Sequence, residues 1–158
     1  MKRAAMMAIR LVLGGLFLAA GLSKVGAPLQ TLAAIYSYQI VLPDWLATTV
    51  AHALPWMEIL LGLGLLAGLW LPVTAGCAAA MLGVFIVLTG QAWWRELPID
   101  CGCVDLSVLH PALAALSTPA GATLRNVVLL ALCGALFWMA RGRQNRHLGP
   151  ITARGNGQ

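Results

Sequence analysis

Two cysteines separated by one glycine stand where several reactive side chains gather in the sequence. The run Asp100-Cys101-Gly102-Cys103 is flanked by one base and two acids, namely Arg95, Glu96 and Asp105. A disulfide across a single residue closes a small ring that departs from relaxed disulfide geometry, so it should be strained and easily reduced. Gly102 supplies the backbone freedom that such a ring needs. The pattern favours thiol–disulfide exchange at Cys101 and Cys103.

The same two thiols allow two other interpretations. As soft ligands they could hold Cu(I), Zn(II) or Hg(II), although only two thiols sit together and no His or Met cluster accompanies them. They could also be structural thiols of a non-catalytic membrane scaffold. Arg95 would favour a thiolate while Asp100 and Asp105 would oppose it, so the sequence does not decide the thiol pKa.

The rest of the chain has the composition of a membrane protein. Of its 158 residues 60% are apolar and 9% charged, against roughly 25% charged in soluble domains. The length fits one domain. The formal net charge of +5 comes mostly from the two ends, and basic residues beside apolar spans are the usual orientation signal of membrane proteins. No basic motif with interleaved aromatic residues supports nucleic-acid binding, so we expect none.

Four apolar runs predict an all-α integral membrane four-helix bundle. The spans are placed at about 5–26, 54–71, 73–94 and 120–140 within one domain, 1–141, followed by a basic tail, 142–158, predicted to be disordered. The first run resembles a signal peptide, but Arg10 interrupts it and three more spans follow. Tyrosines and a tryptophan in 28–54 predict an interfacial segment.

Local signals predict where these helices begin and end. Asp44 can cap a helix that starts at Trp45, in which case Pro55 lies inside the second span and kinks it. Pro72 is expected to end that span. Thr118 followed by Pro119 is typical of an N-cap and a first helical residue, and so predicts the start of the fourth span.

Basic residues predict the orientation. Seven of the ten lysines and arginines lie near the two ends of the chain, namely Lys2, Arg3, Arg10, Arg141, Arg143, Arg146 and Arg154. The positive-inside rule therefore puts both termini in the cytoplasm. Cys101 and Cys103 would then lie on the outer side, where disulfides form and persist.

Ionisable residues inside the spans are candidates for function by default. Glu58 lies about two turns below the outer surface, and either Lys24 or Arg125 can pair with it there. A structural ion pair and a proton-handling role are equally compatible with this placement. Arg10 lies nearer the inner face and can extend its guanidinium to the cytoplasm.

Four further residues have plainer interpretations. Cys77 and Cys133 are expected at similar depth near the cytoplasmic side, where they could meet, but small apolar fillers are the preferred interpretation. His52 and His110 could carry protons beside the thiols, but histidines at an interface are more often only interfacial.

The ordered motifs resemble a known family. Arg10-x-x-Leu13-Gly14-x-x-Phe17-x-x-Ala20-Gly21-x-x-Lys24 resembles the opening of DoxX-like proteins. Leu54-Pro55-x-x-Glu58 and Asp100-Cys101-Gly102-Cys103, followed by Arg125-Asn126, are similar to the methylamine-utilisation (MauE-type) branch. The match covers roughly residues 10–140.

This resemblance implies a four-helix inner-membrane protein for the maturation of exported, disulfide-containing proteins. In the name-giving branch it implies assembly of a disulfide-rich methylamine dehydrogenase subunit beside a periplasmic thioredoxin-like partner. Cys101 and Cys103 would then exchange disulfides, supported by Glu58, Lys24 and Arg125. A quinone cofactor follows only by analogy with other disulfide-generating bundles.

Overall fold

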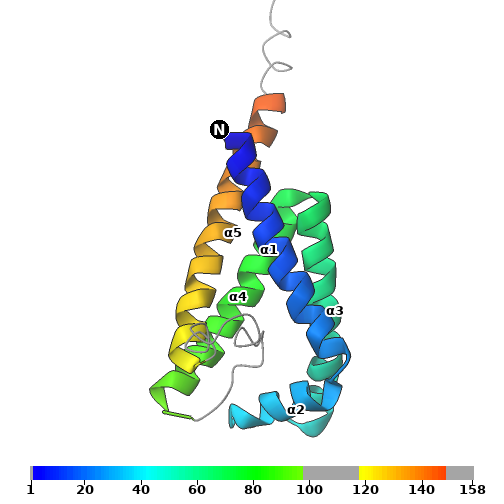
Figure 1. Ribbon diagram of the computed structural model, residues 1–158, viewed down its shortest axis with the longest axis vertical. Coiled ribbons are helices and arrows are strands. Elements are labelled where there is room, and N and C mark those ends of the chain that lie inside the picture. Colours follow the sequence, from blue (N-terminus) through cyan, green and yellow to red (C-terminus); the bar gives the residue numbers. More distant parts are fainter. Residues whose placement is uncertain (1, 98–117, 149–158) are drawn as a thin grey trace, which may run out of the picture.

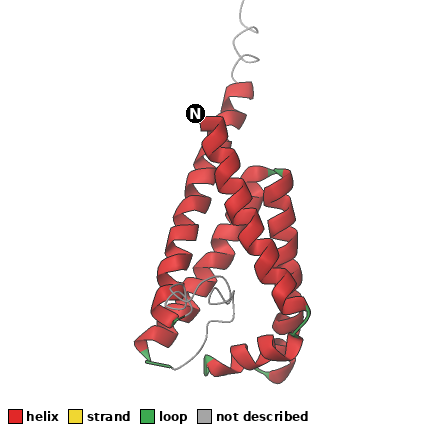
Figure 2. Ribbon diagram, viewed as in Figure 1, coloured by secondary structure: helices red, strands yellow, loops and turns green. Residues whose placement is uncertain are grey.

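A computed structural model of the chain describes residues 2–97 and 118–148. All the regular structure in these residues is helical, and Figure 2 shows helices joined by short loops. The helices are α1 (Lys2–Val25), α2 (Pro28–Ser37), α3 (Asp44–Ala67), α4 (Leu71–Trp94) and α5 (Pro119–Leu148). Cys101, Cys103, Asp100 and His110 lie outside the described residues.

Four of these helices are long and apolar enough to cross a membrane. Within the described ranges the candidate spans are Arg3–Val25, Asp44–Ala67, Leu71–Trp94 and Pro119–Gly142, each of 23 or 24 residues. At about 1.5 Å per residue, such a helix covers a hydrocarbon core of roughly 30 Å. The predicted all-helical membrane protein with four spans is therefore confirmed.

The long helices form two antiparallel pairs, α1 with α3 and α4 with α5 (Figure 1). The start of α1 and the end of α5 lie at one end of the bundle, which we call the termini end. Helix α2 lies across the other end, the α2 end, where α1 and α4 finish and α3 and α5 begin. The two pairs meet in an apolar core that includes Leu13, Phe17, Leu65, Leu82 and Leu136.

Exposed tryptophans mark both ends of the bundle. Trp45, Trp93 and Trp94 lie exposed where α3 begins and α4 ends, and Trp70 and Trp138 lie exposed toward the termini end. Tryptophan favours the headgroup level of a bilayer. Five of the six tryptophans thus lie exposed toward the two ends of the bundle, and Trp56 lies exposed at the middle of α3.

Glycines allow α1 and α3 to approach closely. A Cβ on Gly62 would lie 2.8 Å from the backbone nitrogen of Leu18, and one on Gly21 would lie 2.8 Å from the carbonyl oxygen of Pro55. Gly14 faces the same helix, whereas Gly15 has nothing within 4 Å. Small residues permit this kind of backbone contact between membrane helices.

Helix α3 begins ten residues before the span expected from residue 54. The predicted cap is wrong: Pro43 is the N-cap residue, and Asp44 is the first helical residue and makes no capping hydrogen bond. The Asp44 carboxylate instead accepts a 2.9 Å hydrogen bond from the Tyr36 hydroxyl. Because the helix starts near Trp45, Pro55 lies inside it, as predicted for such a start. Pro55 is buried on the face of α3 that packs on α1.

Helix α3 also ends earlier than Pro72. Gly68 stops it in a left-handed conformation (φ 72°), and the backbone N–H of Gly68 donates to the Gly64 and Leu65 carbonyls. A residue in the left-handed conformation commonly ends a helix, and it is usually glycine, which adopts this conformation without steric cost. Pro72 instead belongs to the first turn of α4, where its missing N–H costs no helical hydrogen bond.

Helix α5 starts as predicted. The Thr118 hydroxyl accepts a 3.2 Å hydrogen bond from the N–H of Gly121, and Pro119 is the first helical residue. At its other end α5 continues to Leu148, into the basic segment from residue 142 onward that the sequence analysis predicts as disordered.

Candidate functional site

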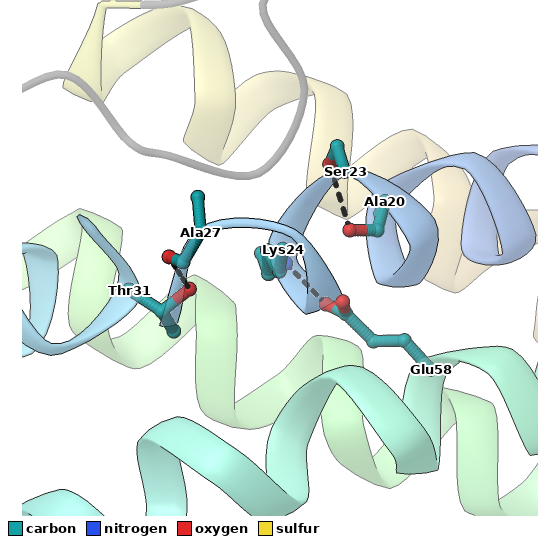
Figure 3. Close-up of polar contacts among 6 residues, drawn as sticks. All are labelled: Ala20, Ser23, Lys24, Ala27, Thr31 and Glu58. Carbon is teal, nitrogen blue, oxygen red and sulfur yellow. Dashed lines mark hydrogen bonds and ion pairs between the residues drawn. The ribbon is translucent and has the colours of Figure 1, made fainter. Parts of the chain in front are cut away.

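An ion pair lies inside the membrane-spanning part of the bundle. Lys24 in the last turn of α1 donates from Nζ to Oε1 of Glu58 on α3 over 2.5 Å (Figure 3). The turn after Lys24 is fixed by a 3.0 Å hydrogen bond from the N–H of Ala27 to the Lys24 carbonyl. Glu58 lies on the same buried stripe of α3 as Pro55 and Gly62. The sequence left Lys24 and Arg125 as alternative partners of Glu58, and the structure pairs it with Lys24.

Both charges are removed from solvent and lipid. The exposed fractions are 7% for Lys24 and 2% for Glu58. A buried charge is tolerated only when it is paired and hydrogen-bonded, because the desolvation penalty is several kcal/mol for each ion. The pair therefore fixes the approach of α1 and α3 to a single arrangement near the α2 end.

Lys24 also connects this helix pair to the other one. Its ammonium lies 5.7 Å from the centre of the Phe85 ring on α4. A cation at this distance is attracted by the negative face of an aromatic ring. The ammonium thus contacts α3 through a carboxylate and α4 through a ring.

A second polar group lies between α4 and α5. The Thr123 hydroxyl donates to Oγ1 of Thr89 over 2.9 Å, and Thr89 is fully buried. Asn126, one turn further along α5, is 3% exposed. Sequence reasoning missed both threonines, because threonine in a membrane helix ordinarily satisfies its hydroxyl on a carbonyl of the preceding turn. Thr89 does this as well, since its hydroxyl donates to the Phe85 carbonyl, and the Thr123 oxygen also lies 2.8 Å from the Pro119 carbonyl oxygen.

Arg10 on α1 hydrogen-bonds to the backbone of α3. Its guanidinium donates to the carbonyl oxygens of Leu65 (3.0 Å) and Leu66 (2.8 Å) in the last turn of α3. Cations are favourable at helix C-termini, where carbonyls lack helical partners. The half-buried guanidinium lies at the end of α3 that faces the termini end of the bundle, and its extension to the cytoplasm stays a prediction. Gly68 leaves the space for the side chain, since a Cβ there would lie 2.3 Å from the guanidinium.

The two cysteines within the spans have different surroundings. Both are free thiols. Cys133 is buried in the apolar core, as expected of a filler. Cys77 is exposed on α4, so the filler interpretation is wrong for this residue. Because one side chain faces the core and the other faces outward, they do not meet as the sequence allowed.

The ion pair includes neither Arg125 nor His52. Arg125 is half-buried on α5. His52 is exposed, and its Nδ1 lies 2.8 Å from the carbonyl oxygen of Thr48 one turn earlier in α3. In residues 2–97 and 118–148, no three His, Cys, Asp or Glu side chains gather in a way that could hold a metal ion.

Comparison with known proteins identifies the family. The sequence model of the family described as "Methylamine utilisation protein MauE" matches residues 2–139. The chain belongs to the MauE family. Methylamine utilization protein MauE of Paracoccus denitrificans is 34% identical over 130 residues, which cover 82% of this chain and 66% of that protein. No solved structure matches the chain.

A second MauE protein supports the assignment. The one from Methylorubrum extorquens is 40% identical over 68 residues, covering 40% of this chain and 34% of that protein. The chain thus spans just under two thirds of the first relative's length and one third of the second's. The MauE part of the predicted resemblance is confirmed, and the wider DoxX-like grouping stays a prediction.

Proposed function

We propose that this MauE family protein is a membrane thiol–disulfide relay in methylamine utilisation. The observation that carries the proposal is the Cys101-Gly102-Cys103 pair in a chain of this family. The proposed partner is a periplasmic thioredoxin-like protein or an exported protein that needs disulfides. The proposed location is the bacterial inner membrane, with the pair on the outer side.

The exchange needs only the two cysteine pairs. A thiolate of the partner attacks one sulfur of the Cys101–Cys103 disulfide, the S–S bond breaks, and the other cysteine leaves as a thiolate that takes up a proton. The second partner thiol, losing its proton, then attacks the mixed disulfide. The partner is thereby oxidised to a disulfide and Cys101 and Cys103 are reduced to thiols, with two electrons transferred. The reverse sequence reduces the partner.

The topology of the described helices supports this proposal. The end of α4 and the start of α5 both lie at the α2 end (Figure 1). The connection that carries the cysteines therefore leaves and re-enters the bundle on one side of the membrane. The Lys24–Glu58 pair lies toward the same end and holds α1 on α3 there. This gives the relay a fixed base at the surface where a soluble partner would approach.

Trapping of the mixed disulfide tests the proposal. Cys101→Ser and Cys103→Ser variants are expressed in cells, and adducts are separated on a non-reducing gel and identified by mass spectrometry. We expect the variant that lacks the resolving cysteine to accumulate a reducible adduct with another protein. The double variant should form none, and Cys77→Ala and Cys133→Ala should behave like the parent.

A metal-binding protein would behave differently. Each single variant would then lose a bound soft metal, measured by elemental analysis of the purified protein, and neither would trap a partner. That outcome contradicts the relay. A host that depends on this protein should also lose growth on methylamine when both cysteines are changed to serine, and normal growth would contradict the assigned pathway.

A further inference from the structure

The termini end of the bundle carries a group of basic residues. Helix α1 begins with Lys2 and Arg3, and the last turns of α5 carry Arg141, Arg143 and Arg146. The two helices contact each other, and α1 begins where α5 ends (Figure 1). These positive charges are therefore gathered on one pair of neighbouring helices.

No carboxylate balances these charges within the described part of the chain. All five acidic residues of the sequence lie between positions 44 and 105. Asp44 begins α3 and Glu96 follows α4, so both belong to the α2 end, and the charge of Glu58 is neutralised in its ion pair. The termini end therefore has an uncompensated positive charge that attracts anions.

Arg3 and Arg141 lie where the hydrocarbon of a bilayer would end. Arg3 is the first residue of the candidate span on α1, and Arg141 is the last but one of the candidate span on α5. Both side chains are exposed, whereas Met6 and Ala140, within one turn of them, are buried. The exposed Trp138, three residues before Arg141, has the residue type that favours the headgroup level. The two arginines are thus placed at the level of the lipid phosphates.

The guanidinium of Arg141 is held by a ring and keeps its hydrogen-bond donors. Its Cζ lies 4.8 Å from the centre of the Phe137 ring, and Phe137 packs against the apolar core. The ring attracts the charge but does not take up the N–H groups, and no hydrogen bond or ion pair in residues 2–97 and 118–148 engages them. A guanidinium positioned in this way can donate two parallel hydrogen bonds to a phosphate.

Charge balance decides which lipid fits this end of the bundle. A zwitterionic headgroup brings an ammonium group beside its phosphate, and no described carboxylate lies there to pair with that ammonium. A headgroup with a net negative charge brings the phosphate without a second cation. Basic residues beside membrane helices are attracted to such anionic headgroups.

We propose that the termini end of α1 and α5 binds the headgroups of anionic phospholipids, with Arg3 and Arg141 donating to the phosphate oxygens. Arg143 and Arg146, on the continuation of α5 beyond its span, add to the attraction. The bound lipid anchors both helix ends in one leaflet. This site lies at the end of the bundle opposite the proposed thiol relay, so its failure would leave the proposed function unaffected.

Native mass spectrometry of the full chain in detergent tests the site. Phosphatidylglycerol or phosphatidylcholine with the same acyl chains is added, and we expect the parent to bind phosphatidylglycerol more tightly. Arg141→Gln should weaken that binding about fivefold, the effect of one basic residue near an anionic membrane surface, and Arg3→Gln with Arg141→Gln should weaken it further. Equal affinity of the parent for the two lipids overturns the proposal.

Arg95→Gln is the matched control. It removes the same charge from an exposed arginine that follows α4 at the other end of the bundle. We expect this variant to keep the preference of the parent for phosphatidylglycerol. If Arg95→Gln and Arg141→Gln weaken the binding equally, net charge alone governs it and the site is wrong.

Thermal unfolding in lipid nanodiscs gives a second measurement, made in a bilayer. A ligand that binds only the folded protein raises the unfolding temperature. Replacing part of the phosphatidylcholine with phosphatidylglycerol should therefore raise the unfolding temperature of the parent, and should raise it less in the variant with both Arg3→Gln and Arg141→Gln. A rise of the same size in that variant overturns the role of the two arginines.

Discussion

At the scale of single residues, the Lys24–Glu58 pair combines two charges that are costly to bury one without the other. Each group alone would be an isolated charge in an apolar layer, and together they are held 2.5 Å apart and almost fully buried. Such a pair adds little over an apolar substitute, but its two members cannot be removed separately without a large cost. This asymmetry can be measured.

We expect Glu58→Gln to destabilise the bundle by about 3–5 kcal/mol, because Lys24 then stays buried without a counter-charge. Lys24→Met combined with Glu58→Leu should recover most of this loss, since neither charge remains. Thermal unfolding in detergent measures both effects. Glu96→Gln is the matched control, because Glu96 is exposed. A Glu58→Gln variant that unfolds like the parent would show that the pair does not hold the bundle.

Tyr36 on α2 and Asp44 at the start of α3 form a hydrogen bond in which both side chains are titratable. The bond from the Tyr36 hydroxyl to Asp44 raises the pKa of Tyr36 above its ordinary value, with further contributions from burial and from the negative charge of Asp44. The tyrosine donates only while it is protonated. The stabilisation is therefore complete below the unfolded-state pKa of about 10 and is lost as the pH rises through the higher folded-state value.

We expect Asp44→Asn to lower the pKa of Tyr36 toward its ordinary value, because the carboxylate acceptor and its charge are gone. Absorbance titration of tyrosinate between pH 9 and 12 measures this, with Tyr36→Phe identifying the contribution of Tyr36. Identical titration curves for the parent and Asp44→Asn would show that the hydrogen bond is not formed in solution.

At the scale of helices, the α1–α3 contact depends on which glycines face it. Gly14, Gly21 and Gly62 lie in the contact, and the atoms nearest to a Cβ at Gly62 are backbone atoms, which cannot move aside as a flexible side chain can. Gly15 lies beside Gly14 in the sequence but faces open space. Adjacent residues on one helix thus have opposite tolerance to a methyl group.

We expect Gly62→Ala to destabilise the bundle by about 1–3 kcal/mol, the usual cost of forcing extra volume into a tight contact. Gly15→Ala should change stability little, and serves as the control. Thermal unfolding of the two variants in the same detergent is the measurement. Equal stability of the two variants would contradict the close packing of α1 on α3.

At the scale of the whole molecule, the four long helices place both described ends of the chain on one side and α2 on the other (Figure 1). The basic residues near the ends predict that the termini side is cytoplasmic. In that orientation the connection from α4 to α5, which carries Cys101 and Cys103, faces the periplasm. The topology and the proposed relay therefore share one test.

We expect a membrane-impermeant thiol reagent to label Cys101 or Cys103 in intact, reduced cells of a variant in which Cys77 and Cys133 are alanine. A cysteine added after Gln158 in a variant without the other four should react only after lysis. Labelling measured by mass shift decides the orientation. If Cys101 and Cys103 react only after lysis, the predicted orientation is wrong and the relay cannot meet a periplasmic partner.

The sequence by itself determined the class of protein and the residues worth asking about. In a long apolar run within lipid, the backbone N–H and C=O groups find their hydrogen-bond partners inside a helix, so the four spans follow from composition and length. A carboxylate in such a run demands a partner, which singled out Glu58, and the Thr118-Pro119 start of α5 depends on neighbouring residues alone. The family also follows from the order of motifs along the chain.

Tertiary structure decided which of several chemically equivalent choices is realised. Lys24 and Arg125 are both cations of suitable depth, and only the approach of α1 to α3 selects Lys24. Arg10 turns onto α3 because Gly68 leaves room there, a fact that involves residues 58 positions apart in the chain. Such contacts depend on how helices pack, and no local pattern encodes the packing of segments that are distant in the sequence.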